Sequence, residues 1–185
     1  MAKRRKKRSV KSLIKNYGLM WRRNSVFWGH GGKRGSLIGR RSRQQIDFRD
    51  QIGVYVLYDE GRRPTYVGQA GRGKARLFNR LSGHTRDSLS LRWQYFSWFG
   101  LLGVNKSGQL SGWDDESKHV GGTIGSTLDE IEGVLIAATE PPFNKQGAKF
   151  RGARYRQVPD PAAGDVSNAE LRDLLNTILI GAEYR

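Results

Sequence analysis

The chain has 185 residues, no cysteine and a formal charge of +16. The missing cysteines exclude disulfides, cysteine zinc sites and thiol catalysis, and no apolar run approaches the roughly 20 residues that a membrane-spanning helix needs. The basic N-terminus is not followed by the hydrophobic stretch of a secretory signal. We therefore expect a soluble cytoplasmic protein whose length suggests one domain with an appendage.

The positive charge is concentrated at the N-terminus. Residues 1–50 contain 16 Lys and Arg against 2 Asp, which gives +14, whereas residues 51–185 carry only +2. This distribution predicts a polyanionic partner, because each neutralised phosphate releases counterions. Nucleic acid is favoured over anionic membrane, since the basic run lacks a clear amphipathic apolar face. The residues expected to contact nucleic acid are Lys3, Arg4, Arg5, Lys6, Lys7, Arg8, Arg40, Arg41, Arg43, Lys74 and Arg76.

The N-terminal segment divides into three parts. Residues 1–11 form a charge run that we interpret as an arm tracking phosphates, with a solubilising or localisation tail as the alternative. Residues 29–45 are rich in glycine and arginine and predict a loop that wraps a duplex, or a flexible linker. Between them, residues 12–28 mix aromatic and basic side chains, which is typical of a short helix packed through Leu13, Ile14, Leu19, Met20 and Trp21.

The body of the protein is expected to begin near residue 46. Residues 52–58 and 65–69 are β-branched and aromatic runs on either side of a polar turn, which predicts an antiparallel hairpin. The elements expected after the hairpin are a loop over 70–74, a helix over 75–84, an aromatic strand over 93–99 and a surface loop over 101–125.

Two capping boxes indicate where the later helices begin. The first starts at Thr127 and opens a helix that ends before the proline pair at 141–142, which cannot continue it. The second starts at Ser167 and opens a C-terminal helix. The element order predicts an α+β fold with a small three-stranded antiparallel sheet flanked by helices. The expected divisions are a basic arm and loop over 1–45, a central domain over 46–155 and a helical extension over 156–185.

Several polar side chains stand out within the predicted body. Tyr55 and Tyr66 fall on the two strands of the hairpin, where pairing brings side chains of one face to within about 5 Å. Arg80 and His84 are four residues apart, so they share one face of a helix. Asn144 follows the proline pair. Each has an ordinary structural interpretation as a packed aromatic, a solvated helix face or a loop cap, and only their convergence favours function.

Glu132 is the most informative of the polar residues. Its neighbours one turn away on the predicted helix are Leu128 and Ile136, so its carboxylate lies on an apolar face. A buried carboxylate without a partner is costly. Two solutions stay open at this point, an ion pair with a nearby arginine or ligation of a hard divalent metal.

The order of these residues resembles that of the GIY-YIG nuclease superfamily. Gly53-Val54-Tyr55 corresponds to the first triplet of the family and Tyr66-Val67-Gly68 to the second. The resemblance covers about residues 50–150. The later landmarks of the family are an arginine, often a histidine four residues on, a helical glutamate and an asparagine after a proline turn, matched here by Arg80, His84, Glu132 and Asn144.

Two positions depart from the family pattern. An ungapped match puts Arg76 at the arginine position, so both candidates stay open, with Arg80 preferred because it brings His84 into register. Many members have a lysine directly after the second triplet, whereas this chain has Gln69, which neither acts as a base nor carries charge. Lys74 is the nearby lysine that would have to take that role.

The resemblance implies a metal-dependent endonuclease that hydrolyses phosphodiester bonds, with double-stranded DNA as the favoured partner. It implies that Glu132 holds one Mg²⁺, with Mn²⁺ as the alternative ion, and that Arg80 binds the non-bridging phosphate oxygens. Tyr55 or Tyr66 would help to deprotonate the attacking water, its pKa lowered by Arg80 and the metal. His84 would relay the proton or bind phosphate, and Asn144 would fix a loop or Tyr66.

The resemblance suits a restriction, defence or mobile-element nuclease of a prokaryote or phage. A non-catalytic DNA- or RNA-binding protein with the same fold is the main alternative, and a basic ribosome-associated protein is a second. The sequence leaves the oligomeric state open, although concerted cutting of a palindromic target would require a dimer.

Overall fold

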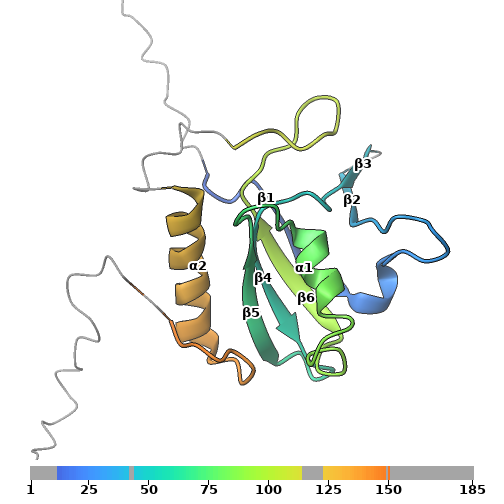
Figure 1. Ribbon diagram of the computed structural model, residues 1–185. Coiled ribbons are helices and arrows are strands. Elements are labelled where there is room, and N and C mark those ends of the chain that lie inside the picture. Colours follow the sequence, from blue (N-terminus) through green and yellow to red (C-terminus); the bar gives the residue numbers. More distant parts are fainter. Residues whose placement is uncertain (1–11, 42–43, 114–122, 149, 151–185) are drawn as a thin grey trace, which may run out of the picture. The chain divides into compact units, whose positions relative to one another are not determined.

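The computed structural model describes residues 12–41, 44–113, 123–148 and 150, all within the first of two compact units of the chain, Met1–Phe150. Figure 1 shows its elements, which follow one another as β1 (Asn16–Arg22), the 3-10 turn η1 (Arg23–Ser25), β2 (Ile38–Arg41), β3 (Gln44–Asp47), β4 (Gly53–Tyr58), β5 (Pro64–Ala70), α1 (Leu77–Gly83), β6 (Tyr95–Gly100) and α2 (Ile124–Thr139).

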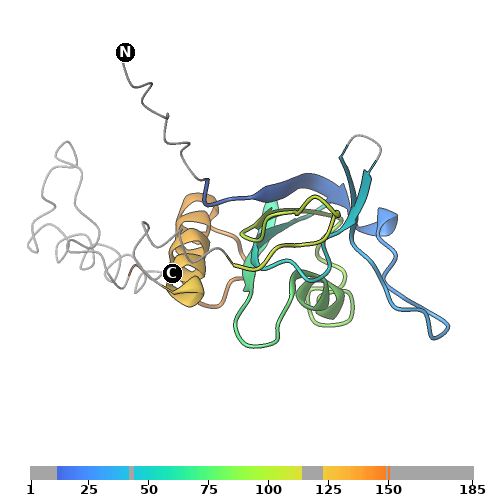
Figure 2. The same ribbon diagram turned by 90° about the horizontal axis from the view of Figure 1, so that it is seen from above.

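Four antiparallel strands form the main sheet in the order β1-β6-β4-β5. Successive side chains of a strand point to opposite faces, and on β4 both faces are buried. Tyr55 and Leu57 pack in one core cluster with residues of α1, whereas Val54 packs in a second cluster with Leu128 of α2. The two helices therefore cover opposite faces of the sheet (Figures 1 and 2).

The larger core cluster lies on the α1 face and is dominated by aromatic side chains. Trp93, Phe96 and Trp98 are each almost completely buried there, together with Leu77 and Leu81 of α1. Full burial of one such side chain contributes about 1.5–3 kcal/mol relative to leaving it in water. This cluster fixes α1, and with it the helical residues of the candidate site, against β4 and β5.

A separate two-stranded sheet is formed by β2 and β3, with Ile38 opposite Asp47. Figure 2 shows this hairpin projecting beside β1. Ile46 and the adjacent Phe48 anchor it to the larger core cluster. Gly39 is required for this contact, because a Cβ atom at that position would lie 2.6 Å from Cε2 of Phe48.

The predicted α+β class is confirmed, but the prediction of three strands is wrong. The segment 12–28, expected to be a helix, contains β1, which pairs with the edge of β6. Its apolar residues pack on both faces of the main sheet: Leu13 and Ile14 pack in the smaller cluster and Trp21 packs in the larger one. This segment forms a strand because its backbone hydrogen-bonds to the edge of β6. A helix would have left the N–H and C=O groups of that edge unpaired.

A β-bulge interrupts β1. Gly18 lies opposite Trp98 and Trp21 lies opposite Phe96, so three residues of β1 span two of β6. Met20, within the bulge, has a φ of +52°, which is unusual for a residue other than glycine. The extra residue turns Trp21 to the face of Trp98, where its indole makes edge contacts with Phe96 and Trp98 at ring-centroid distances of 5.9 and 5.7 Å.

Other sequence expectations are corrected at particular positions. The predicted loop over 29–45 contains β2 and the start of β3. The helix expected to start at Thr127 begins one turn earlier, because the side chain of Thr123 caps it by accepting a hydrogen bond from the Ser126 amide. It ends at Thr139, before the proline pair, as predicted.

Three expectations fall outside the described residues, namely the arm over 1–11, the nucleic-acid contact of Arg43 and the C-terminal helix from Ser167. The domain boundaries at 45 and 155 stay predictions. Among the described residues, no helix combines the length and apolarity needed to cross a membrane.

Candidate functional site

The two tyrosines lie on one face of the β4–β5 hairpin. Tyr55 is directly opposite Gly68, and Tyr66 is directly opposite Leu57, so the phenols are diagonal neighbours with ring centroids 6.3 Å apart. Tyr55 is fully buried, whereas Tyr66 is partly exposed. Gly68 makes this arrangement possible, because a Cβ atom there would lie 2.5 Å from the Tyr55 hydroxyl and 2.8 Å from Cε1 of Tyr66.

A chain of hydrogen bonds runs from Tyr55 through His84 to Asp87. His84 directly follows α1, and its Nε2 lies 2.8 Å from the Tyr55 hydroxyl, while its Nδ1 lies 2.7 Å from Oδ2 of Asp87. Because a carboxylate accepts the Nδ1 proton, Nε2 is left to accept the proton of the phenol. His84 also contacts the ring of Tyr66, at a centroid distance of 5.1 Å.

Burial controls the ionisation of these groups. It raises the pKa of Tyr55 and of Tyr66 above the ordinary value, although the charge of Arg80 acts in the opposite direction on both. Arg80 was expected to lower the pKa of the phenols. Its charge does act in that direction, but desolvation has the larger effect, so the pKa of both phenols is raised. Burial lowers the pKa of His84, more than the hydrogen bond to Asp87 raises it, so the imidazole is neutral at pH 7.

Arg80 connects the parts of the site. It is solvent-exposed on α1, one turn before His84. Its charge interacts with Tyr55, Tyr66 and Glu132, and these interactions raise its pKa, the contribution of Tyr55 being the largest. The other arginine candidate, Arg76, donates hydrogen bonds to the carbonyl oxygens of Gly73 and Ala75 in the loop before α1.

Glu132 lies on α2 and therefore approaches from the opposite face of the sheet. Its Oε2 accepts a hydrogen bond from Nε2 of Gln69 at 2.6 Å, and the same amide nitrogen lies 3.0 Å from Oδ1 of Asp129. Arg72 in turn forms a salt bridge with Asp129. Burial raises the pKa of Glu132. The hydrogen bond from Gln69 and the charges of Arg72 and Arg80 act in the opposite direction. β5 is the edge strand of the main sheet, so among the described strands none lies beyond it between Glu132 and the face that carries the tyrosines.

The surroundings of Glu132 are compatible with a hard divalent cation. Mg²⁺ keeps several of its waters and is commonly held through one or two carboxylates. Gln69 occupies only one carboxylate oxygen of Glu132, and its own Oε1 is buried with no hydrogen-bond partner among the described residues. Carboxylate and amide oxygens are both suitable ligands. Within the described ranges, no three His, Asp or Glu side chains gather into a larger ligand cluster.

Asn144 fastens the free edge of β5. Its Oδ1 accepts from the Val67 amide and its Nδ2 donates to the Val67 carbonyl, both at 2.8 Å. The amide of Phe143 bonds to the Thr65 carbonyl on the same edge. The Asn144 side chain thus makes with Val67 the hydrogen bonds that a neighbouring strand would make. Because Val67 lies between Tyr66 and Gly68, these bonds hold both residues in place.

The residues expected to contact nucleic acid are spread over several elements. Arg40 is exposed on β2, Arg41 ends that strand, and Lys74 is exposed in the loop that also carries Arg76. The remaining expected contacts, Lys3 to Arg8 and Arg43, lie outside the described residues.

Comparison with known proteins matches no family model, no curated protein and no solved structure.

The sequence analysis missed the residues that hold His84 and Glu132 in position. Asp87 follows His84 by three residues, and Asp129 precedes Glu132 by three, a spacing that brings side chains together on a helix or its last turn. These three-residue spacings could have identified Asp87 and Asp129 from the sequence. Gln69 was noted for lacking a charge, yet it is the direct hydrogen-bond partner of Glu132.

The buried imidazole predicts a loss of stability in acid. Because the pKa of His84 in the folded protein lies below its unfolded value of about 6.5, the unfolded chain takes up a proton first as the pH falls. The free energy of unfolding should therefore decrease below pH 6.5, with a slope of at most about 1.4 kcal/mol per pH unit. Urea unfolding at pH 7.5 and 5.5 measures it.

The variant for this test is His84→Gln. It should reduce the difference in unfolding free energy between the two pH values, because it removes the buried imidazole. An unchanged pH dependence in His84→Gln would show that another group is responsible.

Proposed function

We propose that this protein is a metal-dependent endonuclease of the GIY-YIG type, which hydrolyses phosphodiester bonds in nucleic acid, with double-stranded DNA as the favoured substrate. The observation that carries the proposal is the cluster of two phenols and an imidazole beside Arg80: the Tyr55 hydroxyl lies 2.8 Å from Nε2 of His84, the Tyr66 ring lies 5.1 Å from the His84 ring, and Arg80 is one turn before His84 on α1. A surface arginine flanked by such groups suits the binding of a phosphate between them.

The chemistry follows from the separate positions of these groups. Arg80 binds the non-bridging oxygens and stabilises the charge that develops on them as water attacks the phosphorus atom. Tyr66, the more exposed phenol, contacts the attacking water or the phosphate. Tyr55 is fully buried, so it has a positioning role: its hydroxyl donates to Nε2 of the neutral His84 and holds the imidazole beside the ring of Tyr66. Asp87 accepts the Nδ1 proton of His84 and so fixes the tautomer and orientation of the ring.

Glu132 is the residue that would hold the cation, fixed through the amide of Gln69. When bound, Mg²⁺ would supply charge neutralisation at the phosphate and at the departing oxygen. Asn144 has a positioning role, because its two hydrogen bonds go to the backbone beside Tyr66.

Nicking of supercoiled plasmid tests the proposal. The wild-type protein should nick it with Mg²⁺ and not with EDTA. Arg80→Ala should lower the rate by about 10²–10³-fold, the loss typical of removing one donor at a developing negative charge. Arg86→Ala is the matched control, because Arg86 is an exposed arginine just after α1 whose guanidinium bonds to the Ser82 hydroxyl.

Two results would contradict the proposal. Absence of nicking by the folded wild-type protein across DNA and RNA substrates would favour a non-catalytic binding protein. Equal nicking by wild type and Arg80→Ala would assign the activity to other residues or to a contaminant.

A further inference from the structure

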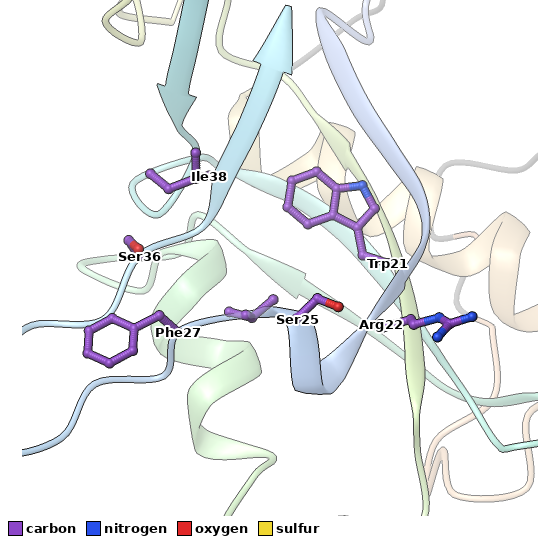
Figure 3. A pocket seen from close by; sticks show the side chains of 7 residues that line it. Trp21, Arg22, Ser25, Phe27, Ser36 and Ile38 are labelled. Carbon is purple, nitrogen blue, oxygen red and sulfur yellow. The ribbon is translucent and has the colours of Figure 1, made fainter.

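A second candidate site lies at the edge of the sheet opposite to β5. A pocket of about 380 Å³ opens between β1, η1 and β2, within the range of 300–1,000 Å³ usual for small ligands. We call it the aromatic pocket, and its main lining residues are Trp21, Arg22, Ser25, Phe27, Ser36 and Ile38. Figure 3 shows the Trp21 indole on one side of it and Ile38, on β2, on the other.

The walls of the aromatic pocket expose apolar surface on a highly charged chain. Phe27 is 37% exposed and Ile38 is 43% exposed, and Trp21 is only partly buried. The β-bulge at Met20 is what turns Trp21 to this side, at the expense of a strained φ. The packing of its indole against Phe96 and Trp98 holds the ring rigidly.

Positive charge surrounds this pocket. Arg22 lies at its rim with the guanidinium pointing outward (Figure 3). Arg40 is exposed on the same side of β2 as Ile38, two residues along the strand. The loop closed by the bridge between Phe27 and Ser36 carries two more exposed cations, Lys33 and Arg34.

The acidic residue closest to this pocket in the strand pairing is Asp47, opposite Ile38. Its carboxylate is engaged by Arg49 at 2.7 Å and accepts hydrogen bonds from the amides of Leu37 and Arg49. The field at the rim is therefore positive, which favours an occupant that joins a flat apolar group to phosphates.

We propose that the aromatic pocket binds an unpaired nucleobase of a nucleic acid chain, with the base against Trp21 and Phe27 and the adjoining phosphates on Arg22 and Arg40. Aromatic side chains beside a cationic track are the usual means of holding unpaired bases. β1 and β5 are opposite edges of the sheet, separated by three strand spacings, or about 14 Å. The proposal shares nucleic acid as partner with the proposed function, but it does not require cleavage.

Binding in EDTA tests this without cleavage. The probe is a DNA duplex with one unpaired 2-aminopurine, whose fluorescence is quenched on stacking, compared with a fully paired duplex and with the same pair made as RNA. Wild type should bind the DNA or the RNA probe more tightly than its paired counterpart and quench its fluorescence. Ile38→Asp and Phe27→Ala should each weaken binding of the unpaired probe about 5- to 150-fold and leave the paired duplex nearly unchanged.

Leu91→Asp is the matched control, because Leu91 is 91% exposed and does not line the pocket. It should behave as wild type, and melting curves establish that every variant is folded. No quenching with either polymer, or an equal loss of affinity for paired and unpaired probes, would overturn the proposal. A change in oligomeric state of Ile38→Asp with base binding intact would also overturn it, by assigning the pocket to a second copy of the chain.

Loss of nicking with retained base binding would contradict only the proposed function. The two proposals are therefore tested separately.

Discussion

Glu132→Ala should abolish Mg²⁺-dependent cleavage while leaving the affinity for DNA nearly unchanged. The expected fall in rate is at least about 10³-fold, because the variant loses the carboxylate proposed to hold the cation. Binding should persist, since most of the positive charge lies elsewhere in the chain. Plasmid nicking and a filter-binding or anisotropy titration measure the two quantities.

Removal of the charge at Glu132 should not unfold the protein. Burial raises the pKa of Glu132, so the folded state holds the proton more tightly than the unfolded chain. That carboxyl group therefore stabilises the fold below its ordinary pKa and loses this contribution as the pH rises through its raised value. At pH 7 the ionised group disfavours folding, and Glu132→Gln should melt no lower than the wild type.

Glu130→Ala is the control, because Glu130 is exposed on the same helix, two residues earlier. It should retain full activity. Cleavage by Glu132→Ala at the wild-type rate, or a large drop in its melting temperature, would contradict the role given to this carboxylate.

Gly68→Ala is expected to damage both folding and cleavage. The new Cβ atom would lie 2.5 Å from the hydroxyl and 2.7 Å from Cζ of Tyr55, and 2.8 Å from Cε1 of Tyr66. Both rings are held by their surroundings, so they can move only by disturbing the core. Overpacking of this kind costs about 1–3 kcal/mol, and displacement of the phenols should reduce the nicking rate further.

A double-variant cycle makes this test specific. Tyr55→Phe removes the atom of closest approach, so Gly68→Ala should cost less stability in that background than in the wild type. Gly83→Ala is the control, since a Cβ atom at Gly83 meets nothing within 4 Å and alanine favours a helix. Additive effects of Gly68→Ala and Tyr55→Phe would show that the clash is relieved elsewhere.

The sequence located most of the central elements. The hairpin was expected over 52–58 and 65–69, and the structure has β4 and β5 at nearly those positions. β-branched and aromatic runs around a polar turn determine such a hairpin locally. The end of α2 was also predictable, because the proline pair cannot continue a helix.

The sequence was misleading at the N-terminal segment. The apolar residues around Trp21 have spacing that fits a helix, yet they form β1 against β6. The bulge at Met20 turns Trp21 into the larger core cluster, whereas Leu13, before β1 begins, packs in the smaller one. The local spacing of apolar residues does not reveal this strand, because its pairing partner, β6, lies more than 70 residues away in the chain.

The candidate site shows the same division. An ordered set of polar residues and a family resemblance were evident from the sequence, where Gln69 was only a departure from the family pattern. Only the structure connects Gln69 with Glu132, and His84 with Asp87. These contacts depend on side-chain orientation, which sequence spacing constrains without fixing.

By itself, the sequence determined the α+β class, the hairpin, the end of α2 and the polar residues worth testing, because periodicity, turn chemistry and charge act locally. Tertiary structure alone decided that the phenols and Glu132 approach from opposite faces of the sheet, that Gly68 leaves room for Tyr55, and that β1 completes the far edge. These features depend on which distant segments fill an open strand edge or a gap in the core, and that competition is settled by packing and hydrogen bonding across the whole fold.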